Sequence, residues 1–132
     1  MAGSFKNDTE NELLDHILGT SSLTMPTVIH AALYISSAPT DSANGTELSG
    51  NGYARSADIA FGAASSGSAN NSAVVDIGPN TTSDWGTVIG MALHDHATTV
   101  NQLMWDDGFS VAFAVGDTAR FPATTGIVVT LD

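Results

Sequence analysis

The stretch WGTVIGMALHDHATTVNQLMWDDGFSVAFAVGDTARFPATTGIVVTL, residues 85–131, decides the fold class. It consists of short apolar runs that are separated by residues typical of turns. The last run, residues 126–131, alternates: Ile127, Val129 and Leu131 point to one face, and the residues between them point to the other. Runs of this length and pattern indicate antiparallel strands.

The same pattern extends towards the N-terminus. A long loop, residues 39–52, and a loop rich in Ser, Ala, Gly and Asn, residues 63–72, separate further apolar runs. Roughly seven or eight strands at this spacing predict a mainly β fold, either an antiparallel β-sandwich or a jelly-roll-like barrel, with one short N-terminal helix. The expected strands are residues 27–35, 53–61, 73–77, 85–94, 100–105, 109–115, 119–121 and 126–131.

One helix is expected over residues 8–18. Asn7 is placed to cap its first turn, Glu10 lies three residues later, and Gly19 follows its last turn. A helix of this length needs a surface to pack against, so its apolar side should face a sheet or a neighbouring subunit. The residues of this apolar side are Leu13, Leu14, Ile17 and Leu18.

The length of 132 residues corresponds to one domain. Residues 1–6 are expected to form a flexible arm without structure of its own, which could become ordered on a neighbouring molecule. Residues 7–132 are expected to form a single β-rich domain.

The charge is strongly acidic. The chain has three basic residues, Lys6, Arg55 and Arg120, against fourteen acidic ones, which gives a net charge of −11. Nucleic-acid binding requires Lys and Arg to neutralise phosphates, and anionic membranes attract basic segments. We therefore expect neither nucleic acid nor membrane as a partner. The chain contains no Cys, which excludes disulfides and thiolate metal sites.

His94 and His96 form the sharpest local motif. On a strand, residues i and i+2 share a face, so both rings could bind one metal ion, with Asp106 or Asp107 as a third ligand. The alternative is a solvated turn at the end of a strand, and this interpretation is preferred. Replacing both His residues by Ala should then cost no more than an ordinary surface change. We assign no metal ligand.

The other polar residues have structural interpretations. Residues 106–108 (DDG) are typical of a hairpin turn rather than of a catalytic carboxylate pair. Ser65 and Ser66 lie outside any nucleophile motif. His16 is expected at a solvated or half-buried helix position, and His30 in the interior of a strand. The chain is therefore predicted not to be an enzyme, with no catalytic and no cofactor-binding residues and no cofactor.

Trp85 and Trp105 have two possible roles. They could be platforms on which sugars stack, which would suit a protein that binds a receptor. Large aromatic residues flanked by apolar residues are more often buried in a core or an interface. The core role is preferred. Loops 39–52 and 62–72 would be the other candidates for contact with a host surface.

The order of motifs resembles a family of small virion proteins of tailed phages, described as capsid-decoration, cement or tail-fibre proteins. The resemblance implies a structural component of the virion that acts through its surfaces. The matching stretches are residues 13–19 (LLDHILG), 32–40 (ALYISSAPT), 50–55 (GNGYAR), 61–72 (FGAASSGSANNS), 84–88 (DWGTV) and 116–132 (GDTARFPATTGIVVTLD).

Within that class a capsid decoration or cement protein that stabilises the assembled shell is the preferred function. The chain lacks the repeats or coiled coil that give a fibre its length. The partner would be the major capsid protein or another virion protein, and analogy with cement proteins suggests a homotrimer on the capsid surface. The alternatives are a tail-tip or tail-fibre protein that binds a host receptor and, least favoured, a metal-assisted enzyme that uses His94 and His96.

Overall fold

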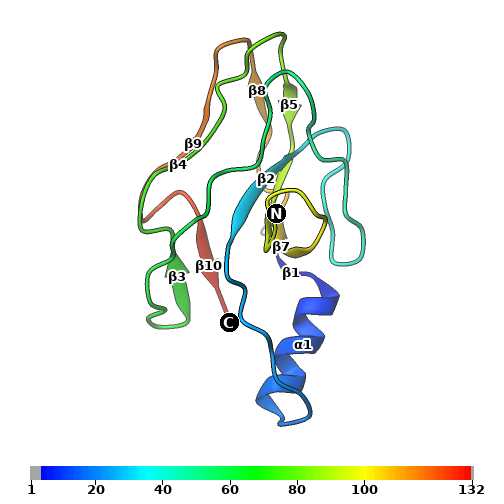
Figure 1. Ribbon diagram of the computed structural model, residues 1–132, viewed down its shortest axis with the longest axis vertical. Coiled ribbons are helices and arrows are strands. Elements are labelled where there is room, and N and C mark those ends of the chain that lie inside the picture. Colours follow the sequence, from blue (N-terminus) through cyan, green and yellow to red (C-terminus); the bar gives the residue numbers. More distant parts are fainter. Residues whose placement is uncertain (1–3, 132) are drawn as a thin grey trace.

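The computed structural model describes residues 4–131, and within them it is mainly β with one short helix near the N-terminus (Figure 1). This confirms the fold class expected from the apolar runs. Among these residues, no helix is long and apolar enough to cross a membrane. The elements are β1 (Ser4–Phe5), α1 (Asn7–Ile17), β2 (His30–Tyr34), β3 (Ser68–Asn70), β4 (Val75–Ile77), β5 (Gly86–Val88), β6 (Gly90–His94), β7 (Gln102–Asp106), β8 (Val111–Phe113), β9 (Ala119–Phe121) and β10 (Val128–Thr130).

The strands form one four-stranded sheet and three two-stranded ribbons, and all described pairs are antiparallel. The sheet has the order β1-β7-β6-β2, and the ribbons are β10-β3, β4-β9 and β5-β8. In the centre of the sheet Ala32 lies opposite Ala92, which in turn lies opposite Trp105. This register decides which side chains share a face.

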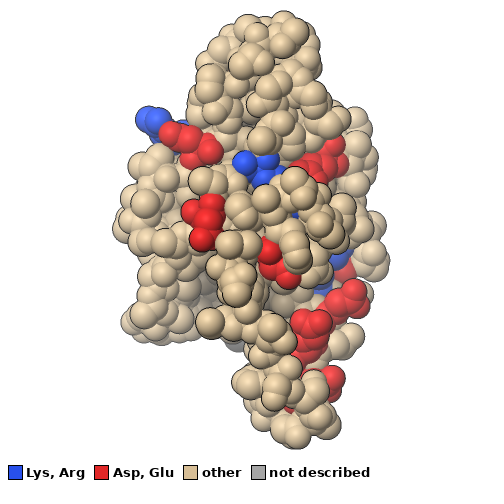
Figure 2. Space-filling model, viewed as in Figure 1, with Lys and Arg blue, Asp and Glu red and all other residues tan. Residues whose placement is uncertain are grey.

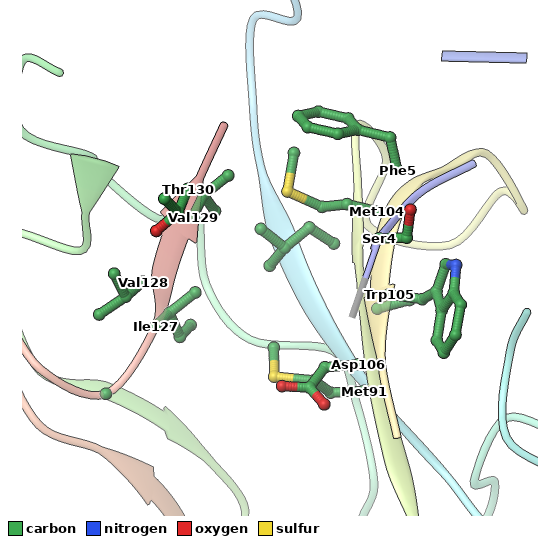
Figure 3. A pocket seen from close by; sticks show the side chains of 13 residues that line it. Ser4, Phe5, Met91, Met104, Trp105, Asp106, Ile127, Val128, Val129 and Thr130 are labelled. Atoms are coloured by element: carbon green, nitrogen blue, oxygen red, sulfur yellow. The ribbon is translucent and has the colours of Figure 1, made fainter. Parts of the chain in front are cut away.

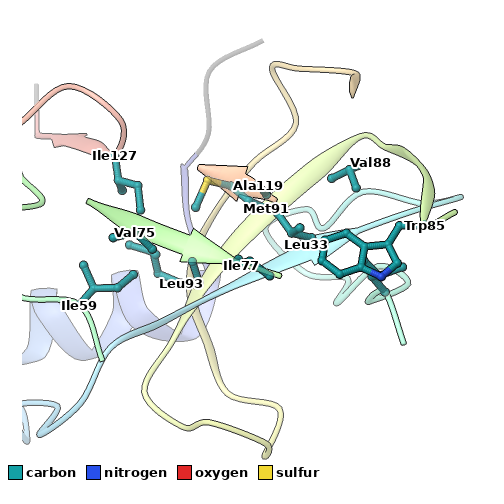
Figure 4. Close-up of a cluster of buried hydrophobic side chains, with 12 residues drawn as sticks. Leu33, Ile59, Val75, Ile77, Trp85, Val88, Met91, Leu93, Ala119 and Ile127 are labelled. Carbon is teal, nitrogen blue, oxygen red and sulfur yellow. The ribbon is translucent and has the colours of Figure 1, made fainter. Parts of the chain in front are cut away.

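The ribbons cover one face of the sheet and enclose the main core (Figure 4). Leu33 on β2 and Leu93 on β6 are 1% and 4% exposed, and they belong to one apolar cluster with Val75 and Ile77 of β4. Trp85 and Ile127 belong to the same cluster. The sheet and the ribbons therefore form two layers around a shared core, as in a β-sandwich whose second layer is divided into short pieces.

The opposite face of the sheet is also buried. Tyr34 and Trp105 lie there with Ala32 and Ala92 in a second, smaller apolar cluster. Residues 39–47 cover this face and are anchored by side chains of the sheet and the arm. Trp105 Nε1 donates a hydrogen bond to Asp41 Oδ1 (3.0 Å), Gln102 Nε2 donates to Asn44 O (2.7 Å), and Lys6 Nζ donates to Thr40 O and Ala43 O (2.6 and 2.7 Å). Part of the loop expected over residues 39–52 is thus a cover of the sheet.

The outer edge of β2 is completed by loop residues rather than by another strand. Leu33 N donates to Tyr53 Oη (3.1 Å), and Ala31 N donates to Ser56 Oγ (2.8 Å). In return, Leu48 N donates to Leu33 O and Ser56 N donates to Ala31 O. Two side-chain oxygens thus take the place of strand carbonyls, so the buried backbone of β2 is hydrogen-bonded and its edge is closed.

The N-terminal segment differs from its prediction. Residues 1–3 lie outside the described residues, but Ser4–Phe5 forms β1 against Trp105 and Met104 of β7. The predicted lack of structure is therefore wrong for Ser4, Phe5 and the buried Lys6, which extend the sheet and anchor its cover. In α1 the N-cap residue is Lys6 and no side chain caps the helix, so the predicted capping by Asn7 is also wrong. Gly19 has the positive φ (+77°) expected after the helix.

Four further predictions, of two strands, a turn and a loop, also differ. Residues 53–61 form no strand, because Tyr53 and Ser56 bond to β2 through their side chains. Residues 85–94 contain two strands, β5 and β6, which join different sheets. Residues 106–108 do not close a hairpin, since β7 pairs with β6 and β1, and β8 pairs with β5. The loop expected over residues 63–72 contains β3, which pairs with β10.

Replacing Tyr53 by Phe tests the side-chain completion of β2. The change leaves Leu33 N–H without its acceptor, so we expect a loss of about 1–3 kcal/mol in the free energy of unfolding, measured by urea denaturation. Thr82→Val removes a hydroxyl that contacts only the Thr81 hydroxyl, at 3.4 Å, and should change stability by less than about 0.5 kcal/mol. Equal stability of Tyr53→Phe and the wild-type protein would contradict this role.

Candidate interaction surface

Helix α1 and the segment that follows it expose several large apolar side chains. Figure 1 shows α1 projecting from the β body, and no residue of the helix is buried. Leu14, Ile17 and Leu18 are 55%, 68% and 74% exposed, and Met25 in the segment that follows is 80% exposed. The apolar side of the helix was predicted to face a sheet or a neighbouring subunit, and in the structure it contacts no sheet of its own chain extensively.

The segment after α1 is held against the helix by its polar side chains. Thr20 Oγ1 donates to Asp15 O and to Asp15 Oδ1, both at 3.0 Å. Leu23 N donates to His16 Nδ1 at 3.2 Å. His16 is thus a local anchor on an exposed helix, as its solvated position suggested. These bonds hold the helix and the following turn together as one projection.

The other side of α1 is acidic. Asp8, Glu12 and Asp15 are spaced by four and three residues, which places them on one face of the helix. Figure 2 shows acidic side chains gathered along the projecting helix. The apolar residues Leu14 and Ile17 lie on the opposite side, because successive residues are rotated by about 100°. Glu10, in the first turn, lies on the same side as Leu14 and Ile17, so the apolar face is free of carboxylates only over the C-terminal half of the helix.

The chain's three cations are all engaged within the molecule. Lys6 bonds to the carbonyls of Thr40 and Ala43. Arg55 makes an ion pair with Glu47 (2.7 Å), and Arg120 makes one with Asp76 (2.8 Å). Because the basic groups are occupied in this way, the exposed surface is dominated by carboxylates and by uncharged groups.

An open apolar groove of about 330 Å³ lies between β10 and the sheet (Figure 3). Met91 of β6, Met104 of β7 and Phe5 of β1 line its floor, and Ile127 and Val129 line the facing wall. Asp106 is the acidic side chain in the lining. The groove exists because the β3-β10 ribbon stands opposite the β1-β7 side of the sheet without filling the space above it. Its lining is better suited to an apolar side chain than to a charged ligand.

The structure separates the two histidines of the predicted metal motif. His94 is fully buried, and its Nε2 lies 2.8 Å from Tyr34 Oη, which also accepts a hydrogen bond from Gln102 Nε2 (2.7 Å). His96 is exposed and lies 2.6 Å from Asp95 Oδ1. The two rings therefore do not converge. No group of three or more His, Cys, Asp or Glu side chains within residues 4–131 could hold a metal ion.

The buried histidine also corrects an expectation about stability. His94 was treated as a solvated turn residue, whereas it lies in a polar network with Tyr34 and Gln102 beneath the 39–47 cover. Burial lowers the pKa of His94 to about 4, and the nearby charge of Arg55 acts in the same direction. His94 is therefore neutral at pH 7. Removing it should cost more than a surface change, because its partners in the core would be left unpaired.

The two tryptophans are core residues, as preferred from the sequence. Trp85 is 3% exposed and makes an edge-to-face contact with Tyr53 at a centroid distance of 5.8 Å. Trp105 is 8% exposed and bonds to Asp41. Neither ring offers an open face on which a sugar could stack.

Sequence reasoning missed the Glu47, Tyr53 and Arg55 cluster. Arg55 Nε and Nη2 donate to the two oxygens of Glu47, and Tyr53 Oη donates to Glu47 Oε1. Burial alone would raise the pKa of Glu47, but the bonds and the charge of Arg55 outweigh it and lower that pKa. Arg55 Nη1 also donates to His96 O and Thr99 O, which fixes the turn between β6 and β7. The cluster is structural, and no sequence motif marks it.

Comparison with known families identifies the chain. A family model matches residues 4–129, which places the chain among phage structural proteins, in agreement with its small antiparallel β fold. The family is Podophage GP4 fiber I protein gp80, and because the match covers nearly the whole chain, the chain belongs to this family. The resemblance to small virion proteins of tailed phages is thereby confirmed. A search of curated proteins found no match.

The buried His94 predicts how stability depends on pH. Its pKa is about 4 in the folded state and about 6.5 when exposed, so only the unfolded chain gains this proton as the pH falls from about 6.5 to about 4. The stability that depends on neutral His94 is fully present above pH 6.5. As the pH falls from about 6.5 to about 4, the free energy of unfolding should decrease by up to about 3 kcal/mol.

The measurement is urea unfolding at pH 7 and at pH 4.5, with ring-proton NMR titration of His94 as a direct readout. His94→Gln should lose this part of the pH dependence, whereas His96→Gln should keep it. Two results together would contradict a buried, neutral His94: an unchanged pH dependence of stability in His94→Gln, and an NMR pKa near 6.5 for His94 in the wild-type protein.

Metal removal should leave the protein unchanged. Dialysis against a chelator should not shift the melting temperature, since His94 faces the core and His96 pairs with Asp95. His94→Ala should lower the free energy of unfolding by about 1–3 kcal/mol, because the neighbouring polar groups lose their hydrogen-bond partner. His96→Ala should lower it by less than about 0.5 kcal/mol. A fall of many degrees on chelation would restore the metal hypothesis.

Proposed function

We propose that the chain is a subunit of a virion fibre, the alternative function considered from the sequence, and that it acts by binding other proteins rather than by catalysis. The observation that carries this proposal is the match of residues 4–129 to a phage fibre family. The projecting helix supports it, because an exposed apolar face on a small acidic protein is suited to assembly with other protein surfaces.

The arrangement of the polar side chains supports a role in binding rather than in catalysis. His94 is buried in a structural network, and His96 and Asp95 bond to each other at the surface. The carboxylates of α1 face solvent. These arrangements supply no pair of groups that converge on a substrate position. The partners would be copies of the same chain, in a homotrimer, and another virion protein at the point of attachment.

A place in a fibre is compatible with the observation that favoured capsid decoration. A fibre needs length, and this chain contains neither repeats nor a coiled coil. Length can arise from several different subunits, with this chain supplying one short segment. The internal pairing of Lys6, Arg55 and Arg120 also supports the expectation that nucleic acid and anionic membranes are not partners.

Particles of the phage that encodes this chain provide the test. A gold-labelled antibody against the chain should mark a fibre in electron micrographs, and particles from a phage with the coding sequence deleted should carry no label. The deletion particles should retain normal shell stability on heating and should adsorb poorly to host cells. Label over the capsid, with rupture at a lower temperature and normal adsorption, would instead establish capsid decoration.

A further inference from the structure

Helix α1 lacks the packing that a short helix needs. It has eleven residues, none of them buried. Isolated helices shorter than about 12–15 residues are marginal in water. Its described attachments are at its base, where Asn7 N donates to Asp41 O, and at its end, where Leu23 N donates to His16 Nδ1. The C-terminal half of the helix, which includes Leu14 and Ile17, is not buried by any of residues 4–131.

The apolar face is suited to a symmetric contact. Leu14, Ile17 and Leu18 follow the i, i+3, i+4 spacing of a helical stripe, and Met25 adds a flexible apolar side chain at the same projection. A single stripe of this kind can meet its own copies about a symmetry axis, because each copy presents the same residues to the others. The helix projects beyond the β body, which leaves room for other helices beside it (Figure 1).

The distribution of charge favours copies of this chain as the occupant. Each copy carries a net charge of −11, so copies can meet only where carboxylates are kept apart. When the stripes face one another over Leu14, Ile17 and Leu18, the acidic residues Asp8, Glu12 and Asp15 lie on the outer side in water. Glu10 lies on the side of the stripe but in the first turn, at the base of the helix, so the contact is confined to the C-terminal half. A basic partner would instead be drawn to this acidic side and would leave the apolar stripe uncovered.

We propose that α1 is the self-association element of the protein, with the Leu14, Ile17 and Leu18 faces of several copies packed against one another. This inference deepens the proposed fibre function by naming the surface through which the subunits join. The β bodies would then be arranged around a short helical bundle, and three copies are expected. The groove between β10 and the sheet is the competing site for the helix of another copy.

The absence of Cys from the sequence allows a direct test with single-cysteine variants of the full chain. Ile17→Cys should form disulfide-linked dimers under mild oxidation, because Ile17 residues of different copies lie together. Glu12→Cys, on the acidic face of the same helix, is the matched control and should remain unlinked. Equal cross-linking of the two variants would overturn the proposal.

A second variant separates assembly from folding. Ile17→Asp places a charge at a site that is 68% exposed in the single chain, so the fold should persist, as near-ultraviolet circular dichroism can show. Sedimentation should show trimers for the wild type and for Glu12→Gln, and loss of the trimer for Ile17→Asp. A wild-type chain that stays monomeric up to its solubility limit, or an Ile17→Asp variant that still assembles, would overturn the proposal.

A mixing experiment distinguishes the helix contact from the groove. If α1 instead enters the groove of a neighbour, Ile17→Cys should link to Met104→Cys in a mixture and should not link to itself, and this result would overturn the helix bundle. The location of the protein on the virion is measured independently. A failure of the helix contact with the label still on a fibre would leave the proposed function intact.

Discussion

The pairing of β2 with β6 is the constraint on which the rest of the structure depends, because both faces and both edges of β2 are occupied. Its odd residues Ala31 and Leu33 enter the main core beneath the ribbons, and its even residues Ala32 and Tyr34 enter the second cluster beneath residues 39–47. One edge pairs with β6, and the other is completed by Tyr53, Ser56 and nearby backbone groups. A strand buried in this way fixes the positions of the ribbons, the cover and the loop at its edge, since a shift by one residue would exchange its two faces.

The cover over residues 39–47 shows how polar groups stabilise this arrangement. Gln102 and Trp105 reach from the sheet to Asn44 and Asp41, and Lys6 reaches from the arm to the carbonyls of the same segment. Gly45 permits the close approach of the chain to itself, since a Cβ there would lie 2.7 Å from Pro39 N and its φ is +69°. The segment therefore presents an exposed outer side on a backbone that is fixed from below. Contact with another protein here would meet a shaped surface rather than a flexible loop.

The sequence allowed the fold class and most strands to be predicted, because short apolar runs between turns have few other structures available. Prediction from the sequence failed where side chains replace backbone groups as hydrogen-bond partners. Residues 53–61 have the composition of a strand, yet Tyr53 and Ser56 bond to β2 through hydroxyl groups, which no periodicity reveals. The roles of His94 and His96 could not be separated either, since both lie at the end of the same apolar run and only the tertiary cover buries the first. Trp85 and Trp105 were assigned correctly because large aromatic residues in a small β domain are usually buried.

Acidity restricts how such a protein can assemble. Fourteen acidic residues against three internally paired cations produce repulsion between copies at every approach, and this repulsion weakens as salt screens the charges. Apolar contact between α1 helices should therefore be favoured by added salt, because only the opposing repulsion is screened. Attraction to a basic virion surface should be weakened by the same salt, since there the charges provide the attraction. The sign of the salt effect depends on which face of α1 is used: the proposed apolar stripe would join like copies, and the acidic side would join an oppositely charged partner. Because these faces are separated in the C-terminal half of α1, the helix could make both contacts at once within a virion assembly of the proposed kind.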